Sequence, residues 1–408
     1  MDAVVADPTF VVHVFLDGAR RDLAADVRAI KINVGRSRVQ DVFTAGTCSI
    51  SLNNQDNAYS PLGGGTYGDA QWINAEVRVN VFLNSASQPT TIFRGKIDDT
   101  DVLFPDGTDS TVILKCSDGL STLAKTELND VDFVEQVGSA RFTAILDNAQ
   151  VAYPDESSPL DRDIDTSTII MAAETVAGLQ TATYTARLAQ SEDGAIYCRH
   201  GLPGGAAAAS TKRGNVMTYK KRYAGTTPTG LTFIGSGGND TQPPMTALKT
   251  TYGSEILFTR SVYAGSTGTD QIVNDEPRQA LYGIRTIVRR NLLNLNDADV
   301  ESAATNFVLL YSTPALRVSQ LTCMPRSMSE AQAEAVAKLG IWDGIQVSFT
   351  PVGAGTAQQR IVRIEGVMHD ITPMGWTMRL NTSGSGDQQY FILDSTIDGI
   401  LNINKMAP

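Results

Sequence analysis

Apolar and polar residues alternate along most of the first 125 residues, which is the pattern of β-strands with one buried face. The stretches FVVHVFLDG, VRAIKINVGR and FTAGTCSISL show this period of two, and Cys48, Ile50 and Leu52 take alternate positions in the third. The next stretch, NNQDNAYSPLGGGTYG, has the Asn, Asp, Ser-Pro and Gly residues of a loop. We therefore predict an N-terminal β-domain over residues 1–125.

One strand pattern occurs twice, near opposite ends of the chain. VRVNVFLN, TTIFRGKIDD and STVILKCS surround Gly95, and GIQVSFTP, QRIVRIEGVMHD and WTMRLNTS surround Gly366. In both copies the middle strand has a large apolar residue two positions after the glycine and Asp four positions after it. Glycine inside a strand usually marks a bulge or a sharp bend, as at a barrel corner. The pattern predicts two similar small β-barrels bent at Gly95 and Gly366. Because the match is short and gapped, chance similarity of two β-units is the alternative.

Helical spacing is found between the two copies. SARFTAILDNA has apolar residues at i, i+3, i+4 and i+7, and a second helix is predicted from about Thr168 to Val176 on the same grounds. ATYTARLAQSEDGAIYCRHG predicts a helix, a tight Asp-Gly turn and a short strand. The clearest helix begins at Asn296 or Asp297 and ends before Pro314. A further helix is predicted from the Ser-x-x-Glu capping box at residues 327–330.

The predicted fold is mainly β with α+β parts, and two similar small β-barrel domains are separated by intervening regions. Residues 1–125 form the first barrel domain, and residues 126–212 form a mixed α/β domain. Residues 213–283, rich in strand fragments, Pro and Gly, form a β-rich domain or an insertion. Residues 284–408 contain helices followed by the second barrel domain.

The composition is that of an acidic globular protein. Its 408 residues carry a formal net charge of −11, which disfavours nucleic acid or an anionic membrane as the main partner. The four cysteines lie far apart and are expected to be buried free thiols. Asp2 and Asp7 stand where a signal peptide needs Lys or Arg, and no apolar run reaches the roughly 20 residues of a membrane span. We expect synthesis and assembly in the cytoplasm.

Motifs that would carry chemistry are weak. Gly63, Gly65 and Gly68 form a GxGxxG pattern, but a loop precedes it and a strand follows, unlike a dinucleotide-binding fingerprint. Cys198 and His200 fall on one face of a strand, where we expect a half-buried structural pair rather than a Cys–His hydrolase. The sequence thus predicts no enzyme.

Metal-binding patterns are also weak. The three histidines have no zinc-site spacing, so a His-containing zinc site is not expected. KIDDTDV and PDESSPLDRDID carry clustered carboxylates, which could bind Ca²⁺, but the EF-hand order is absent and acidic loops are more often simply solvated. We predict no cofactor and no resident metal, with calcium at these loops as the alternative.

The motif order resembles that of a known family. FTAGTCSISLNNQDNAYSP, VRVNVFLN and IFRGKIDD are similar to the N-terminal barrel of tail hub proteins of long-tailed bacteriophages, also called baseplate hub or minor tail proteins. YGIRTI, LLYSTPALRVSQLT, WDGIQVSFTP and VRIEGVMHDITPMGWTMRLN resemble their C-terminal part, and ARLAQSEDGAIYCRHG resembles their middle domain. The resemblance covers about two thirds of the chain and is weakest over residues 201–275.

The resemblance implies a structural protein of the virion tail tip, assembled in the host cytoplasm without membrane insertion by this chain. In that family a homotrimer with two barrels per subunit forms a pseudo-six-fold ring. The ring joins the tail tube and its distal tail protein to three-fold tip, spike or fibre proteins. It surrounds the channel for the tape measure protein's C-terminus and for DNA. Gly95 and Gly366 would be barrel bends, and Trp72 and Trp342, which precede barrel strands, are expected packing anchors.

Two other functions stay open. A receptor- or carbohydrate-binding tail adhesin would use the aromatic-rich loop TYGDAQW, with Tyr67 and Trp72. A wall-degrading enzyme is the third possibility, although no nucleophile, metal set or carboxylate dyad stands out.

Overall fold

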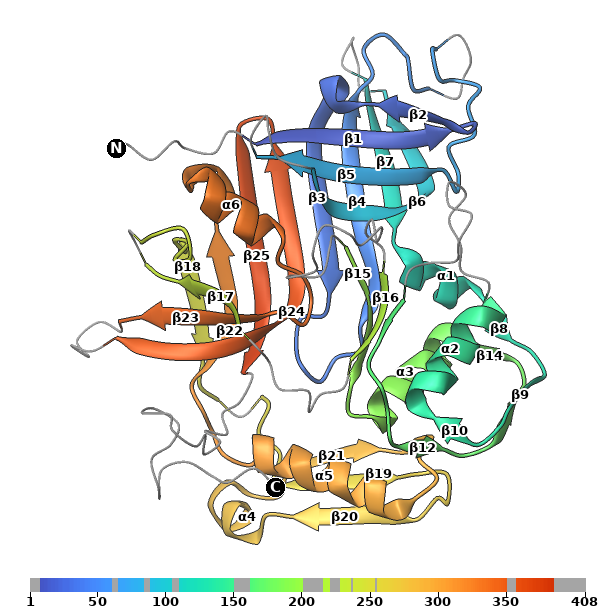
Figure 1. Ribbon diagram of the computed structural model, residues 1–408, viewed down its shortest axis with the longest axis vertical. Helices are drawn as coiled ribbons and strands as arrows, with labels where there is room; N and C mark the ends of the chain where they lie inside the picture. The colour runs from blue at the N-terminus through green and yellow to red at the C-terminus, as the bar shows by residue number, and fades with distance from the viewer. Residues whose placement is uncertain are drawn as a thin grey trace.

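The computed structural model describes residues 8–60, 65–83, 89–104, 110–149, 162–200, 216–220, 228–235, 238–253, 255–350 and 357–384. Its largest element is a 13-stranded sheet in the upper and left-hand parts of Figure 1. The strands from the first third of the chain are Thr9–Leu16 (β1), Ala19–Asp22 (β2), Val27–Gly35 (β3), Thr44–Asn53 (β4), Glu76–Phe82 (β5), Thr90–Leu103 (β6) and Thr111–Ser117 (β7). The strands from the last part are Pro228–Phe233 (β17), Ala247–Thr251 (β18), Arg317–Cys323 (β22), Gly344–Phe349 (β23), Gln358–Thr372 (β24) and Gly375–Gly384 (β25).

The strand order in this sheet repeats. One half reads β3-β4-β7-β6-β5-β1 and the other reads β18-β22-β25-β24-β23-β17. When β2, which pairs only with β1 at the edge of the sheet, is left out, both orders numbered along the chain are second, third, sixth, fifth, fourth and first. We call the two sets the N-terminal unit and the C-terminal unit. They differ in the last pairing, because β1 is antiparallel to β5 whereas β17 is parallel to β23. The duplication predicted from the sequence is therefore present in the strand order.

The two units are not separate barrels. β24 pairs antiparallel with β3, from Gly366 opposite Gly35 to Ile371 opposite Ile30, and this pairing is called the seam below. One hydrophobic core continues through both units. The pairing path runs open from β18 to β2, so the described strands form no closed barrel. The expectation of two barrels held apart by intervening regions is corrected, because alternation shows which faces are buried but not which distant strands pair.

A second core, at the right of Figure 1, is built from short elements around three helices. The helices are Gly119–Lys125 (α1), Gly138–Ala149 (α2) and Thr181–Ser191 (α3). The strands are Glu127–Leu128 (β8), Val131–Phe133 (β9), Gln136–Val137 (β10), Arg162–Ile164 (β11), Ile170–Met171 (β12), Glu174–Val176 (β13), Leu179–Gln180 (β14), Ala195–Arg199 (β15) and Val216–Lys220 (β16). The helix, tight turn and strand predicted for this region are α3, Asp193 with a φ of 46° and β15.

The helix predicted from Thr168 is wrong. This segment forms β12 and β13, which pair with β10 and β9. Helical spacing over only nine residues also fits two short strands, and the β-branched residues Ile169, Ile170, Thr175 and Val176 favour the extended form.

A third core lies at the bottom of Figure 1. It contains Arg260–Ala264 (β19), Asp270–Asn274 (β20), Thr286–Arg289 (β21), Glu276–Tyr282 (α4) and Asp297–Tyr311 (α5). α5 matches the clearest predicted helix, and its apolar face is buried in this core. Within the span 213–283, β17 and β18 belong to the large sheet, whereas β19 and β20 belong to this core. None of the helices among the described residues is long and apolar enough to cross a bilayer.

The last helix, Glu330–Ala337 (α6), has a capping box at a different serine from the predicted one. Ser329, not Ser327, caps it: its hydroxyl accepts from the backbone N–H of Gln332, whose side chain accepts from the Ser329 N–H. Ser327 instead ends a short 3₁₀ turn, Pro325–Ser327, and a similar turn spans Ala24–Asp26. Gly340 lies just beyond the end of α6, as expected.

Candidate functional site

The seam joins the two units through a pair of glycines. Gly366 is the Cα partner of Gly35 on one side and of Asn381 on the other, directly after a bulge at Glu365. A Cβ added to Gly366 would lie 2.6 Å from the Arg36 carbonyl oxygen, and one added to Gly35 would lie 2.3 Å from the Glu365 carbonyl oxygen. Gly35 also has a φ of +95°, which favours glycine. No side chain larger than hydrogen fits at either position without a shift of backbone.

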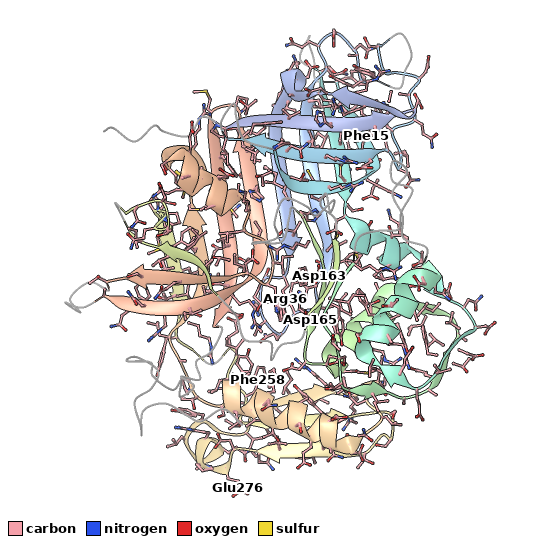
Figure 2. All side chains as sticks on the ribbon, viewed as in Figure 1. Phe15, Arg36, Asp163, Asp165, Phe258 and Glu276 are labelled. Atoms are coloured by element: carbon pink, nitrogen blue, oxygen red, sulfur yellow. The ribbon has the colours of Figure 1, made fainter. Side chains whose placement is uncertain are left out.

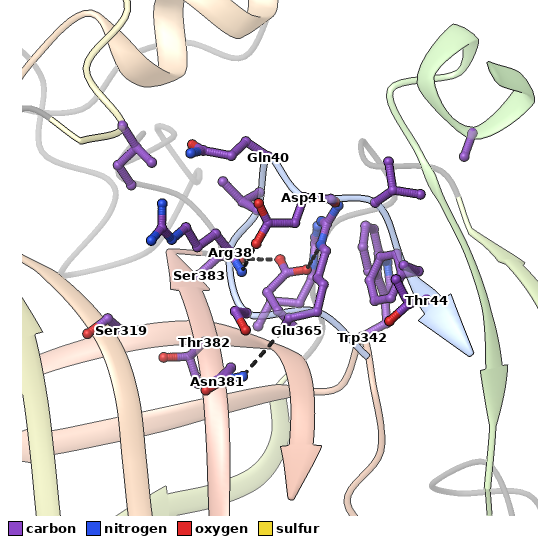
Figure 3. Close-up of a pocket in the computed structure, with 18 of the residues that line it drawn as sticks. Arg38, Gln40, Asp41, Thr44, Ser319, Trp342, Glu365, Asn381, Thr382 and Ser383 are labelled. Atoms are coloured by element: carbon purple, nitrogen blue, oxygen red, sulfur yellow. Dashed lines mark hydrogen bonds and ion pairs between the residues drawn. The ribbon is translucent and has the colours of Figure 1, made fainter. Parts of the chain in front are cut away.

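A buried ion pair lies beside these glycines, between Arg36, which is labelled in Figure 2, and Glu365, which is labelled in Figure 3. The Arg36 Nε donates to Glu365 Oε2 at 2.7 Å, the Ser383 hydroxyl donates to the other carboxylate oxygen, and the Arg36 guanidinium packs 4.3 Å over the Phe43 ring. Burial by itself raises the pKa of Glu365. The positive charge and hydrogen bond of Arg36, the Ser383 hydroxyl and the nearby Arg363 outweigh burial, so this pKa lies below its usual range. The carboxylate is therefore ionised and fastens the bulge of β24 to the end of β3.

A cavity of about 1550 Å³ opens next to the seam, where the three cores meet (Figure 3). Its walls come from residues 36–45, α1, α3, the end of α5, β22 and the end of β25. It is larger than the roughly 300–1000 Å³ of typical small-molecule pockets. The described lining residues include no His and no Cys, and three of the lining acids form ion pairs with arginines: Glu365 with Arg36, Asp193 with Arg289, and Glu255 with Arg38. These ion pairs join segments that are far apart in the chain around the cavity.

Trp342, one of the four residues predicted to be structurally important, lines this cavity. It has a φ of 74°, its ring stacks on Tyr197 at 6.3 Å, and the Arg363 guanidinium lies 4.3 Å above it. Its backbone N–H donates to the carbonyl of Ile364, one residue before the bulge. Trp342 thus packs against the core of the large sheet, beside the seam.

Trp72 and Gly95 lie in the N-terminal unit, away from the seam. The Trp72 ring is buried, its Nε1 donates to the Tyr67 carbonyl at 3.1 Å, and it contacts Tyr59 and Tyr67 edge-on. Gly95 is opposite Val77, and a Cβ there would lie 2.3 Å from the Ser117 carbonyl oxygen. Close backbone approach is therefore shared by Gly95 and Gly366.

The structure brings together a cluster that the sequence pattern showed only in part. Asp118, Cys198 and His200 place their ligand atoms within 4.8 Å of one another, and only Cys198 and His200 are paired in the sequence pattern. His200 Nδ1 accepts from the backbone N–H of Arg94 at 3.1 Å, so a neutral imidazole carries its proton on Nε2, which faces Asp118 Oδ2 at 3.3 Å. Burial raises the pKa of the Cys198 thiol well above its usual value.

This donor set does not fit a metal ion or a catalytic thiol. A metal on His200 Nε2 would move the imidazole proton to Nδ1, where it would point at another N–H donor. A protonated, fully buried Cys198 is a poor ligand and a poor nucleophile. Asp118 is already occupied as the N-cap of α1, accepting from the Leu120 N–H at 3.0 Å. The cluster ties α1 to β6 and β15.

The acidic segments considered for calcium are paired with lysines where they are described. Lys115 contacts Asp99 and Asp101, and Lys220 contacts Asp163 and Asp165. Asp98 likewise pairs with Lys125. Asp155, Glu156 and Asp161 lie outside the described residues.

Two solved tail proteins have a similar fold. A 43 kDa tail protein of prophage MuSo2 from Shewanella oneidensis matches with a TM-score of 0.60 at 11% identity, covering 93% of this chain and 99% of its own. The fold is that of phage tail proteins. A tail protein of Neisseria meningitidis MC58 matches with a TM-score of 0.58 at 9% identity, covering 92% and 97% of the two chains.

A third similar structure extends the likeness beyond phages. The Escherichia coli c3393 protein matches with a TM-score of 0.51 at 13% identity, covering 88% of this chain and 73% of its own. It is described as a component of the type VI secretion system with structural similarity to the T4 bacteriophage tail proteins gp27 and gp5. No protein-family model matches the sequence, and the search of curated proteins found no match. The likeness to tail proteins is thus one of fold.

Proposed function

We propose that this protein is the structural hub of a phage tail tip, a non-enzymatic homotrimer that forms a ring of pseudo-six-fold symmetry. The repeated strand order of the two units, fused through the seam into one sheet, is the observation that carries this proposal. The tail-protein fold supports it.

The repeat gives a physical reason for such a ring. A head-to-tail ring closes only when each interface repeats at the correct rotation. Three copies with two alike units each present six near-equivalent surfaces, which suits a six-fold tail tube, while every other part occurs three times. Sheet edges left open in one chain invite pairing with other chains, and ring closure would cover them.

A polar row across the seam suits the wall of the channel. Cα pairing runs without a break from Thr377 through Asp370, Lys31, Ser49 and Lys115 to Asp99, and crosses six strands of both units. The row consists of two acids, two lysines and two hydroxyl residues. We propose that this face surrounds the tape measure protein's C-terminus and, later, DNA. A face without excess positive charge would let phosphates pass without binding.

The proposed neighbours follow from this position. The ring would contact the distal tail protein above and tip, spike or fibre proteins below, and the chain would be part of the virion after assembly in the host cytoplasm.

The two alternatives have less support. A tail adhesin would need the aromatic rings of the TYGDAQW loop at the surface, but Trp72 is buried and Tyr67 stacks on Tyr59 at 5.6 Å between ring centroids. For a wall-degrading enzyme, Cys198 would be a poor nucleophile, because burial raises the pKa of its thiol.

Electron microscopy and mass photometry of the purified full chain test the proposal. The expected particle is a ring with three times the chain mass of 43.7 kDa and an open centre. Antibody labelling of intact virions should mark the tail tip. A monodisperse monomer at high protein concentration, or label distributed along the tail, would rule the hub out. Binding to purified host cell wall would favour the adhesin, and a cleared zone in a zymogram would favour the enzyme.

A further inference from the structure

The large sheet has two open edges that occupy equivalent places in the two units. One edge is β18, which pairs only with β22 among the described strands. The other is the second half of β6. β5 pairs with the first half, and Asn74 and Ala75 are still hydrogen-bonded to Ile97, but β7 is the only described strand that pairs with residues 99–103. β18 lies at the left of the sheet in Figure 1 and β6 at its right, so the two edges are on opposite sides.

Two rows of Cα partners identify the equivalent residues. Each row starts directly after a bulge on a long strand, crosses four strands of one unit and ends at a lysine. The rows are Asp99, Lys115, Ser49 and Lys31 in the N-terminal unit, and Gly366, Asn381, Gln320 and Lys249 in the C-terminal unit. β18 with Lys249 therefore corresponds to β3 with Lys31, and the open half of β6 corresponds to the part of β24 that forms the seam.

The sequences agree with this equivalence. Residues 29–35 read AIKINVG and residues 247–253 read ALKTTYG, so Ala, Lys and Gly recur at the same places. The glycine of the first segment is Gly35, at which the seam begins, and the second segment keeps it. The residues that lead into the two bulges also agree, because residues 96–98 read KID and residues 363–365 read RIE. The duplication therefore includes both kinds of strand that meet at the seam.

The seam shows how strands of these two kinds pair. Residues 30–35 of β3 lie antiparallel to residues 366–371 of β24, starting directly after the bulge. The same antiparallel register would place residues 248–253 opposite residues 99–104. Asp99 carries a side chain where the seam has a glycine, so we expect this pairing to begin at the next residue.

Exposed apolar side chains on the two edges fit this register. The seam ends with Ile371 opposite Ile30, and both side chains are buried in the core of the large sheet. The equivalent residues are Phe104, which is 58% exposed, and Leu248, which packs against the same core. Pairing of the two edges would cover Phe104 as the seam covers Ile371, and burial of an apolar ring favours association.

The charges on the two edges are opposite. On the β6 edge, Asp99 and Asp101 share a single partner, Lys115, which leaves an excess of negative charge. β18 carries Lys249 and no acidic residue. In the shared register Lys249 would lie opposite Leu103 and diagonal to Asp101 on the same face, within reach of its carboxylate.

We infer that β18 of one copy pairs with the open half of β6 of the next copy in the ring, so that the seam is repeated between chains. A head-to-tail ring needs two different surfaces that fit each other on every copy. Six near-equivalent units around one axis also need the junction between copies to resemble the junction within a copy, which is the seam. Such pairing would bond the open backbone groups of both edges. The inference rests on the proposed ring and names the strands and the register that close it.

Cysteine cross-linking tests the register in the full chain. L103C/K249C places thiols at the positions equivalent to Asp370 and Lys31, which are Cα partners in the seam. Directly opposite residues on antiparallel strands have Cα atoms about 4.5–5.5 Å apart, within reach of a disulfide. After mild oxidation with diamide, denaturing electrophoresis should show covalent dimers and trimers that return to single chains on reduction.

Three controls accompany the cross-linking. The wild type and the two single variants should remain single chains, since the native cysteines are buried. V102C/K249C is the matched control for the register. A shift of one residue places its two thiols on opposite faces of the sheet, so it should give little cross-linking.

A proline substitution at Val102 tests the backbone pairing. In the seam, the Arg36 N–H donates to the Glu365 carbonyl, which directs the backbone groups of every second residue from there, including His369, toward β3. Val102 corresponds to His369, so its N–H points to the open edge. V102P should fold, because an open edge tolerates proline, but should raise the protein concentration for half-assembly by at least about tenfold. V102T keeps the N–H and should assemble like the wild type.

The outcomes separate this inference from misfolding and from the proposed function. Circular dichroism and the thermal midpoint of dilute V102P should match those of V102T, and if V102P fails to fold, the cross-linking decides. A wild-type ring that L103C/K249C does not cross-link, or a ring that forms equally well from V102P and V102T, would overturn the inference while the hub stands. Equal cross-linking of V102C/K249C would overturn it too, because the register would be wrong. A wild-type protein that never assembles would overturn both the inference and the hub.

Discussion

Gly35 and Gly366, from opposite ends of the chain, are Cα partners across two antiparallel strands, and neither leaves room for a side chain. The carbonyl oxygen of Glu365 lies where a Cβ of Gly35 would be, and that of Arg36 lies where a Cβ of Gly366 would be. This close approach turns two six-strand units into one sheet with one core. The relative orientation of the two units, which a ring would depend on, is therefore set by backbone contact rather than by a linker.

Replacing Gly366 by alanine should destabilise the protein. The new methyl group would meet the Arg36 carbonyl at 2.6 Å, and overpacking of this kind costs about 1–3 kcal/mol. Urea denaturation at a fixed protein concentration measures the loss. Gly375→Ala on the neighbouring strand is the matched control, because its Cβ would meet nothing closer than 3.7 Å. Equal stability of the two variants would contradict the close approach at the seam.

Removing one partner of the Arg36–Glu365 pair should lower the free energy of unfolding more than replacing both partners does. Glu365→Gln leaves a buried guanidinium without its counter-charge, which typically costs about 3–5 kcal/mol, whereas R36M/E365L replaces both charges with apolar groups and should lose less than the sum of the single changes. A double-mutant cycle by urea denaturation gives the coupling energy. Additive losses would show that the pair is not coupled.

The pH dependence of the same pair has a definite sign. The pKa of Glu365 is lower in the folded state than its ordinary value of 4.5, so the unfolded chain takes up its proton first as pH falls. The stability contributed by this charge is fully present above about pH 4.5 and is lost as pH falls through the folded-state pKa. The stability difference between the wild type and Glu365→Gln should be constant between pH 6 and 8 and shrink below pH 4.5. A constant difference down to acid pH would contradict an ionised Glu365.

The repeated unit could be predicted from the sequence because strand alternation and an interior glycine are local patterns. The seam could not be predicted, because glycine is needed at position 366 only where β24 lies against the end of β3. Neither segment contains a local pattern that identifies the other as its partner. Local ambiguity caused the smaller errors. Ser327 and Ser329 each precede Glu or Gln by three residues, and only the path of the chain into α6 selects Ser329. His200 and Asp118 are far apart in the chain, so only the folded structure shows that they are partners.

The cluster of Asp118, Cys198 and His200 should bind no metal. His200 Nδ1 accepts from the Arg94 N–H, so its Nε2 holds a proton and is not available as a ligand. Elemental analysis of protein purified without chelator should find no stoichiometric zinc. Phenanthroline should leave the thermal midpoint unchanged, because no folding free energy is contributed by a metal. One zinc per chain, lost together with stability on chelation, would contradict this tautomer.

His369 should make the protein acid-sensitive. Burial, and to a smaller extent the charge of His200, lower the pKa of His369 from 6.5 to about 3, and its Nδ1 accepts from Trp376 Nε1 at 3.2 Å. Between these pH values the unfolded chain binds a proton that the folded chain excludes, so the free energy of unfolding falls by up to about 1.4 kcal/mol per pH unit as pH decreases. The stability from the neutral ring is fully present above about pH 6.5.

The variant His369→Gln isolates this effect, because glutamine keeps an acceptor for Trp376 but does not titrate. Urea denaturation at pH 7, 6, 5 and 4, at one protein concentration, should give a stability advantage of the wild type that shrinks steadily from pH 6.5 downward. Carboxylates titrate alike in both proteins and cancel in this difference. Parallel stability curves would mean that His369 takes up a proton as readily in the folded state as in the unfolded chain, and the hydrogen bond from Trp376 would then have to be absent.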